Sequence, residues 1–250
     1  MIKNLIKQRF TKSLETYSNS AVIQKHMAEK LTVMLKKKCY DNILELGCGT
    51  GFVTENIVKN INFNTYDAMD LVSGCAKFIS SISEKINFYN ADFEKYIPDR
   101  KYDLIISNAA MQWLDDFIKF VYRITKYLNK NGTFAFTVFG SKNFEELKFI
   151  TGLKYYSMSE LKNILRDFEI EEISEEKIVL NFNTPKEALM HIKKTGANAI
   201  IQKHWTKTDL RNFEIEYSKI CKDKIKLTYN PIYVVLNSFM EFNYKENRHF

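Results

Sequence analysis

Proline, histidine and cysteine are scarce in this chain of 250 residues, which holds 3 prolines, 4 histidines and 4 cysteines. No two cysteines form a C-x-x-C pair, so the sequence predicts reduced thiols and neither a disulfide nor a structural metal. No apolar run approaches the roughly 20 residues of a membrane span. The first residues, MIKNLIKQRF, lack the apolar stretch of a signal peptide. We therefore expect a cytoplasmic protein that does not bind membranes.

An excess of basic residues gives the chain a formal charge of +7, from 37 Lys and Arg against 30 Asp and Glu. This charge favours an acidic partner. Because lysines occur along the whole chain, a generally solvated surface is the stronger interpretation. The sequence shows no RNA-binding module and no strip of alternating basic and aromatic residues, so we do not expect nucleic acid as a partner.

The order of apolar segments predicts an α/β fold, with a Rossmann-like doubly wound sheet of about seven strands. Residues 3–37 read as helical, in two pieces. Strands are expected near 42–46, 64–69, 86–90, 103–107, 132–139, 170–180 and 227–239, and helices near 52–59, 72–84, 113–129, 157–167 and 184–220.

These elements divide the chain into four parts. We expect an N-terminal helical segment over 1–40, an α/β core over 41–183, a helical insert over 184–222, and the last core strand with a polar tail over 223–250. The insert leaves the sheet and returns to it. It is placed to cover a cleft at the carboxyl ends of the strands, where ligands of open α/β sheets bind.

A glycine-rich turn, ILELGCGTGF, follows the first predicted core strand. Gly47, Gly49 and Gly51 are spaced G-x-G-x-G, whereas a dinucleotide-binding turn needs G-x-G-x-x-G. Glu45 precedes them at the end of the strand, where a carboxylate would repel a pyrophosphate but suit a cationic ligand. The turn therefore favours S-adenosylmethionine, which carries a sulfonium and an ammonium but no phosphate.

Polar residues also follow the next three strands. Asp70, with Leu71 beside it, is placed to accept hydrogen bonds from ribose hydroxyls, and Asp92 from the adenine amino group. Asn108 lies at the mouth of the cleft. Singly, these residues read as a helix N-cap, a turn former and a strand-end group. Together, at successive strand ends, they indicate a cofactor site.

This set resembles the class I S-adenosylmethionine-dependent methyltransferases over residues 41–140. The resemblance implies that Glu45 and the three glycines hold the methionine part of the cofactor. It also implies that Asp92 and Phe93 hold adenine, and that Asn108 approaches the methionine end. Amino methyltransferases that act on DNA bases or on protein glutamine usually carry a [D/N/S]-P-P-[Y/F/W] element after the fourth strand, where this chain reads NAAM from Asn108 to Met111. Cytosine-C5 enzymes need a nucleophilic cysteine, often in a Pro-Cys pair, which is absent here.

Five further segments are similar to the malonyl-[acyl-carrier protein] O-methyltransferases of biotin synthesis. They read RFTKSLETYSNSAVIQ, SNAAMQWL, FTVFGSKNFEEL, ALMHIKKTGANA and LTYNPIYVV. The resemblance implies a malonyl thioester with a free carboxylate as the acceptor, carried by an acidic acyl carrier protein or by CoA. Because a carboxylate is already ionised at pH 7, its methylation needs no general base.

The acceptor site must hold one anionic group, so cations and hydroxyl or amide donors are its candidates. They are Arg9, Tyr17 and Gln24 in the first helices, Lys193, Thr195 and Asn198 in the insert, and Lys148. Arg9 and Lys193 read equally well as solvated surface charges, and Tyr17 as a core aromatic residue. Lys148 stands where related enzymes often carry Arg, and Lys is only a point donor.

Two other functions fit the same cofactor site. One is an O-methyltransferase for a free small carboxylic acid, such as an aconitate-like compound. The other is a non-catalytic protein that binds S-adenosylmethionine and regulates a partner, because binding alone also needs the acidic residues at the strand ends.

Overall fold

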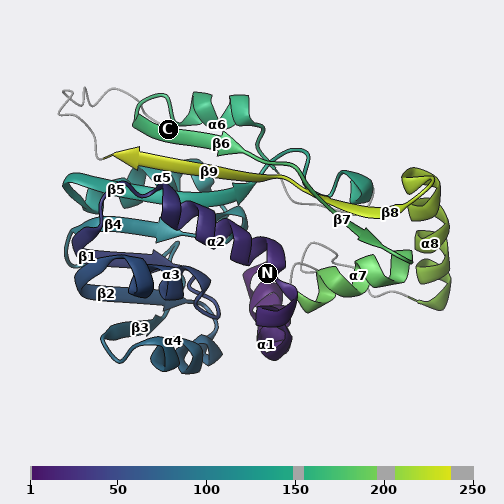
Figure 1. Ribbon diagram of the computed structural model, residues 1–250, viewed down its shortest axis with the longest axis horizontal. Coiled ribbons are helices and arrows are strands. Elements are labelled where there is room, and N and C mark those ends of the chain that lie inside the picture. The colour runs from purple at the N-terminus through teal and green to yellow at the C-terminus, as the bar shows by residue number, and fades with distance from the viewer. Residues whose placement is uncertain (1, 149–154, 196–205, 238–250) are drawn as a thin grey trace.

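The computed structural model describes residues 2–148, 155–195 and 206–237, which form a layered α/β core and a smaller projecting part (Figure 1). The helices are α1 (Ile2–Ser20), α2 (Val22–Met34), α3 (Phe52–Asn60), α4 (Ala76–Ile82), α5 (Phe117–Ile124), α6 (Met158–Ile164), α7 (Pro185–Lys194) and α8 (Lys207–Cys221). The strands are β1 (Cys39–Leu46), β2 (Asn62–Asp70), β3 (Ile86–Asn90), β4 (Tyr102–Ser107), β5 (Leu128–Phe139), β6 (Glu169–Glu175), β7 (Ile178–Phe182), β8 (Ile225–Tyr229) and β9 (Pro231–Asn237).

Seven of the strands form one sheet in the order β3-β2-β1-β4-β5-β9-β6. The first five in this order are parallel, and β9 runs antiparallel to both of its neighbours. The chain builds outward from β1 in one direction and then crosses to β4 on the other side. This arrangement confirms the predicted doubly wound sheet, and it places the switch of strand order, where ligands bind in such folds, between β1 and β4.

Alternating side chains of the central strands build two cores, one on each face of the sheet. Ile43 packs on the face covered by α2, α3 and α4, whereas Leu44 packs on the face covered by α5 and α6. Both side chains are completely buried. Central strands covered on both faces are rich in apolar residues, which is why their positions could be predicted from the sequence.

The segments expected as single strands over 170–180 and 227–239 are each divided between two sheets. β6 and β9 belong to the large sheet, whereas β7 and β8 pair with each other in a two-stranded antiparallel sheet. At the division, the Glu176 amide donates to the Pro231 carbonyl at 2.9 Å, and the Asn230 side-chain amide donates to the Glu176 carbonyl at 2.8 Å. The insert therefore has strands of its own as well as helices.

Two helices of the core are shorter than the sequence predicts. The helix expected over 72–84 starts with a 3₁₀ turn, Ser73–Cys75, before α4. The helix expected over 113–129 is reduced to α5, because the Asp116 carboxylate accepts the Lys119 amide at 2.9 Å and caps the helix there. Apolar periodicity continues beyond such caps and cannot locate them.

The first helix links the core to the insert. The Thr16 hydroxyl donates to the Lys194 carbonyl at the end of α7, 3.4 Å away. Figure 1 shows α7 and α8 with the β7-β8 sheet on the side of the molecule away from β1–β4. Among the described residues, every helix is too short or too polar to cross a membrane.

Candidate active site

A cavity of about 900 Å³, part of it open to solvent, lies where the carboxyl ends of β1, β2 and β4 meet α1. The predicted cofactor residues Glu45, Gly47, Gly49, Asp70, Leu71, Asp92, Phe93 and Asn108 all line it, together with Lys3, Lys7, Phe10, Tyr17, Phe52 and Trp113. Gly51 does not line the cavity and lies behind it, at the start of α3.

The glycine turn passes close beneath the cavity. The amides of Gly47 and Cys48 both donate to the Met69 carbonyl, at 2.8 and 3.0 Å, which holds the turn against the end of β2. Gly47 has φ +73°, and a Cβ at this position would lie 2.5 Å from the Cβ of Ala110. Gly51 caps α3 with φ +94°. The turn therefore needs glycine for its backbone conformation and for close packing.

Glu45 is buried at the floor of the cavity, with 2% of its surface exposed. One of its oxygens, Oε2, accepts hydrogen bonds from the Thr54 hydroxyl at 2.6 Å and from the Tyr66 hydroxyl at 2.5 Å. Burial raises the pKa of Glu45 to about 7, although both hydrogen bonds act in the opposite direction. A cationic ligand would favour the ionised form and lower this pKa.

Cofactor affinity is therefore expected to depend on the protonation of Glu45. Below pH 7 the site must release a proton to bind a cation, so the dissociation constant should rise by up to about tenfold per pH unit. Calorimetric titration between pH 5.5 and 8.5 checks this expectation. Glu45→Gln should bind weakly and without this pH dependence, and an equal slope in wild type and variant would contradict the assignment.

The same ionisation sets a pH dependence of folding. The pKa of Glu45 is about 7 in the folded chain, against an ordinary value of 4.5. The folded state therefore holds the proton more tightly, and its contribution to stability is present below pH 4.5 and lost as the pH rises to 7. Within this range, each pH unit changes the free energy of unfolding by at most about 1.4 kcal/mol.

Asp70 fastens the glycine turn to the loop after β2. Its Oδ2 accepts the Gly49 amide at 3.0 Å and its Oδ1 accepts the Val72 amide at 2.8 Å. Burial raises the pKa of Asp70, although these backbone hydrogen bonds oppose the shift. The Cys75 thiol and the Leu71 amide also hydrogen-bond to Asp70, so a ligand in the cavity would share this carboxylate with donors of the protein itself.

Asp92 meets a lysine that the sequence did not single out. Lys3 Nζ lies 3.0 and 2.9 Å from the two carboxylate oxygens of Asp92, and it also pairs with Glu94. Lys3, Lys7 and Phe10 all line the cavity, and their i, i+4, i+7 spacing on α1 places them on one face of the helix. The spacing alone does not show what this face contacts, so the sequence could not assign the helix to the site. Lys7 makes no ion pair within the described residues.

Asn108 uses its side-chain amide to join structural elements. Its Nδ2 donates to the Gln24 carbonyl of α2 at 2.9 Å, and its Oδ1 accepts the Thr137 hydroxyl of β5 at 2.7 Å. The Thr137 hydroxyl in turn accepts the Ala109 amide at 2.8 Å. Asn108 therefore lines the cavity while its polar atoms hold α2, β4 and β5 together.

Replacing Asn108 should therefore cost stability. Asn108→Ala leaves the Thr137 hydroxyl and the Gln24 carbonyl without their partner, and we expect a loss of about 1–3 kcal/mol in the free energy of unfolding. Urea denaturation measures this loss. Thr137→Val removes the same bond from the other side, so the double variant should lose less than the sum of the two; strict additivity would contradict the network.

Aromatic side chains form one wall of the cavity. The ring of Tyr17 lies 4.8 Å from Phe10 in an edge contact and 5.7 Å from Phe52 in a stacked one, measured between ring centroids. Phe93, which follows β3 and also lines the cavity, packs against Phe120 of α5, with 5.5 Å between the ring centroids. Burial raises the pKa of Tyr17 above its usual range, so its hydroxyl stays protonated. This wall can limit the access of water to a bound ligand.

Of the seven acceptor candidates, Tyr17 is the one that lines the cavity. Arg9, Gln24, Lys148, Lys193 and Thr195 lie outside the lining, and Asn198 lies outside the described residues. Lys148 and Lys193 are exposed. Thr195 is buried, and its hydroxyl donates to the Ile192 carbonyl at 3.0 Å, at the end of α7. Lys193 and Thr195 lie in α7 and at its C-terminal end, and no residue of α7 lines the cavity.

The residues that line the cavity fit S-adenosylmethionine. A buried carboxylate suits the cationic end of the molecule, two further carboxylates suit its ribose and adenine, and aromatic rings suit its apolar surface. The described residues of the lining include no histidine. Across the described residues, no three His, Cys, Asp or Glu side chains gather as metal ligands would.

Comparison with known proteins agrees with this geometry. The profile of the family described as "Methyltransferase domain" matches residues 19–175 of the chain. The chain belongs to this methyltransferase family. Its fold resembles solved structures at low sequence identity. A putative methyltransferase from Bacillus halodurans has a TM-score of 0.64 and 14% identity, over 85% of this chain and 99% of that one. A putative methyltransferase solved in complex with the Haloferax volcanii Trm112 activator has a TM-score of 0.65 and 15% identity, over 95% of this chain and 99% of that one.

Curated relatives are similar over almost the whole length of this methyltransferase. The malonyl-[acyl-carrier protein] O-methyltransferase of Chlorobium luteolum is 34% identical, over 96% of this chain and 97% of the relative. The enzyme of that name from Calditerrivibrio nitroreducens is 36% identical, over 95% and 98%. The one from Haemophilus influenzae is 32% identical, over 93% and 94%. The similarity thus includes the insert as well as the core.

Proposed function

We propose that this methyltransferase transfers the methyl group of S-adenosyl-L-methionine to the free carboxylate of a malonyl group carried by an acyl carrier protein. The product would be the malonyl methyl ester that starts the pimeloyl chain of biotin. The observation that carries the proposal is the near full-length similarity to the O-methyltransferases that bear this name, at 32–36% identity.

The chemistry suits a site without a general base. S-adenosylmethionine would supply an electrophilic methyl group on a sulfonium. An acceptor carboxylate is ionised at neutral pH, so its oxygen can form the new bond to carbon as the carbon–sulfur bond breaks, with the electron pair left on sulfur. No proton moves, and the positive and negative charges cancel. The step needs no metal.

The protein's own part would be binding, alignment and exclusion of water. Glu45, held by Thr54 and Tyr66, would favour the cationic end of the cofactor. Asp70 and Asp92 would accept hydrogen bonds from its ribose and adenine. Tyr17 would lie at the boundary between cofactor and acceptor, and its apolar surroundings favour a reaction in which opposite charges neutralise each other.

We place the reaction in the cytoplasm, with S-adenosylmethionine and an acidic carrier protein as partners. All four cysteines are free, and three of them, Cys48, Cys75 and Cys221, are buried, as in proteins of a reducing compartment.

Genetic rescue tests the physiological role. A bacterial strain that lacks malonyl-carrier methylation requires biotin, and expression of this chain should restore growth without it. Asp70→Ala, expressed to the same level, should not restore growth. Failure of the well-expressed wild type to rescue would contradict the proposal.

A further inference from the structure

Positive charge is concentrated in residues 178–229, which comprise β7, the helical insert and β8. Residues 178–229 contain 10 of the 37 basic residues but only 5 of the 30 acidic ones, so about a fifth of the chain carries +5 of its net charge of +7. The remainder of the chain is almost balanced. The charge is therefore a local property of this region, although the sequence as a whole favoured an evenly solvated surface.

Helix α7 gathers part of this charge on one face. Lys186, Met190 and Lys193 follow each other at i, i+4 and i+7, so they form one stripe along the helix. All three are exposed, and Met190 has 42% of its surface in solvent. Ala188 and Ile192 lie on the opposite side of the helix and are buried.

The stripe consists of two cations around an apolar side chain. Within the described residues, the ammonium groups of Lys186 and Lys193 form neither an ion pair nor a hydrogen bond. Such a combination suits a protein partner that offers carboxylates around an apolar side chain.

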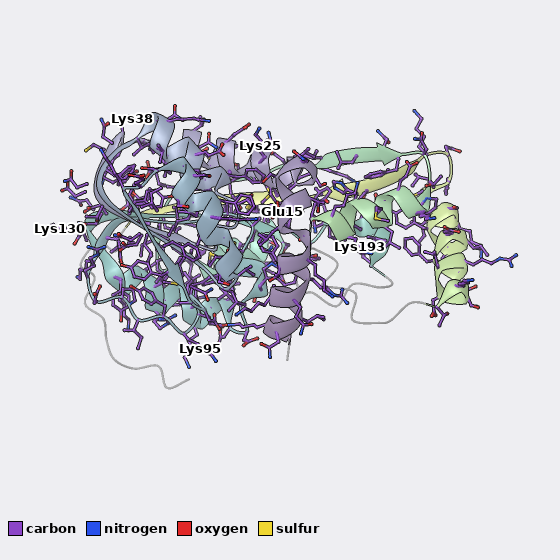
Figure 2. All side chains as sticks on the ribbon, turned by 90° about the horizontal axis from the view of Figure 1, so that it is seen from below. Glu15, Lys25, Lys38, Lys95, Lys130 and Lys193 are labelled. Carbon is purple, nitrogen blue, oxygen red and sulfur yellow. The ribbon has the colours of Figure 1, made fainter. Side chains whose placement is uncertain are left out.

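The C-terminal end of α7 contacts α1, the helix that supplies part of the cavity lining. The carbonyl of Lys194, which follows Lys193, accepts the hydroxyl of Thr16. The next residue of α1, Tyr17, lines the cavity. Figure 2 shows Lys193 on α7 next to α1, whereas Lys38 and Lys130 lie at the opposite end of the molecule. A partner bound along α7 could therefore pass a flexible arm directly to the cavity.

We propose that Lys186, Met190 and Lys193 form the docking surface for the acidic acyl carrier protein, with the thioester arm entering beside Tyr17. This inference rests on the proposed function for the identity of the partner. It gives Lys193 a role in binding the carrier, outside the cavity, in place of the contact with the malonyl carboxylate that the sequence suggested.

Two readouts test the surface with the full-length enzyme. The first is the affinity for carrier protein that bears an unloaded phosphopantetheine arm, which requires no methyl transfer. The second is a comparison of kcat/KM for two substrates, malonyl-carrier protein and malonyl-pantetheine. Both present the same malonyl group, but malonyl-pantetheine lacks the carrier protein. At low salt, Lys186→Glu/Lys193→Glu should raise the dissociation constant for the unloaded carrier, and lower kcat/KM for malonyl-carrier protein, by about tenfold or more. The difference between variant and wild type should shrink at higher salt, which screens the charges.

Matched variants separate docking from a general charge effect. Lys38→Glu/Lys130→Glu makes the same change of charge at exposed positions far from α7. It should keep near wild-type affinity for the carrier. Met190→Ser should weaken carrier binding without any change of charge, and Lys186→Glu alone should leave methylation of malonyl-pantetheine unchanged.

The outcomes distinguish the two proposals. Equal carrier affinity in wild type and in the α7 double variant overturns the docking surface, and so does an equal loss in the Lys38/Lys130 control. Loss of malonyl-pantetheine methylation in Lys193→Glu alone also overturns it, because Lys193 then acts inside the acceptor site. If the wild type methylates no malonyl thioester, the proposed function fails, whatever the affinity for the unloaded carrier.

Discussion

Asp70→Ala is expected to raise the dissociation constant of S-adenosylmethionine by about tenfold or more. The side chain accepts the amides of Gly49 and Val72, so its loss releases the glycine turn as well as the acceptor proposed for the ribose hydroxyls. Isothermal titration of the purified variant measures the effect. Circular dichroism of the same samples reports whether the variant is folded.

Two further variants make this result specific. Asp70→Asn keeps the size of the side chain and one acceptor oxygen, but its NH2 group must face the amide of Gly49 or of Val72, so it should lose some stability and also bind the cofactor more weakly. Asp99→Ala removes an exposed carboxylate that does not line the cavity and should leave the affinity unchanged. Wild-type affinity in folded Asp70→Ala would refute the assignment of the cofactor site.

Tyr17→Ala should lower kcat for malonyl-carrier methylation by roughly 100-fold, because it opens the aromatic wall to water and loosens the alignment of the reacting groups. Tyr17→Phe keeps the contacts with Phe10 and Phe52 and loses only the hydroxyl. It should therefore lose less than about tenfold. Initial rates at saturating cofactor compare the two variants.

An exposed tyrosine far from the aromatic wall provides the control for Tyr17. Tyr89→Ala, which removes a tyrosine with 39% of its surface exposed, is the matched control and should retain full activity. If Tyr17→Ala were as active as that control, the wall would have no part in catalysis.

The core of the fold could be predicted from the sequence because its central strands are buried on both faces. Apolar runs such as NILEL in β1 and LIIS in β4 mark such strands directly. The division of 170–180 and 227–239 into two sheets could not be predicted. It depends on hydrogen bonds between Glu176, Asn230 and Pro231, which are distant in sequence and meet only in the folded chain.

The cofactor side of the site was predictable for a similar reason. Parallel strands bring their carboxyl ends to one edge, so Glu45, Asp70 and Asp92 had to lie near each other once the strands were placed. The acceptor side was not, because it depends on how α1 and the insert pack on that edge. Lys3 reaches Asp92 across 89 positions of sequence, and no local pattern records such a contact.

The most direct test of the proposed function is the intact mass of malonyl-carrier protein after incubation with the enzyme and S-adenosylmethionine. We expect the malonyl group to gain one methyl group, with release of S-adenosylhomocysteine in equal amount, while free aconitate and other small diacids remain unmodified. Methylation of free diacids alone would identify a different carboxyl O-methyltransferase. Binding of the cofactor without any methylated product would identify a regulator, and either result would contradict the account.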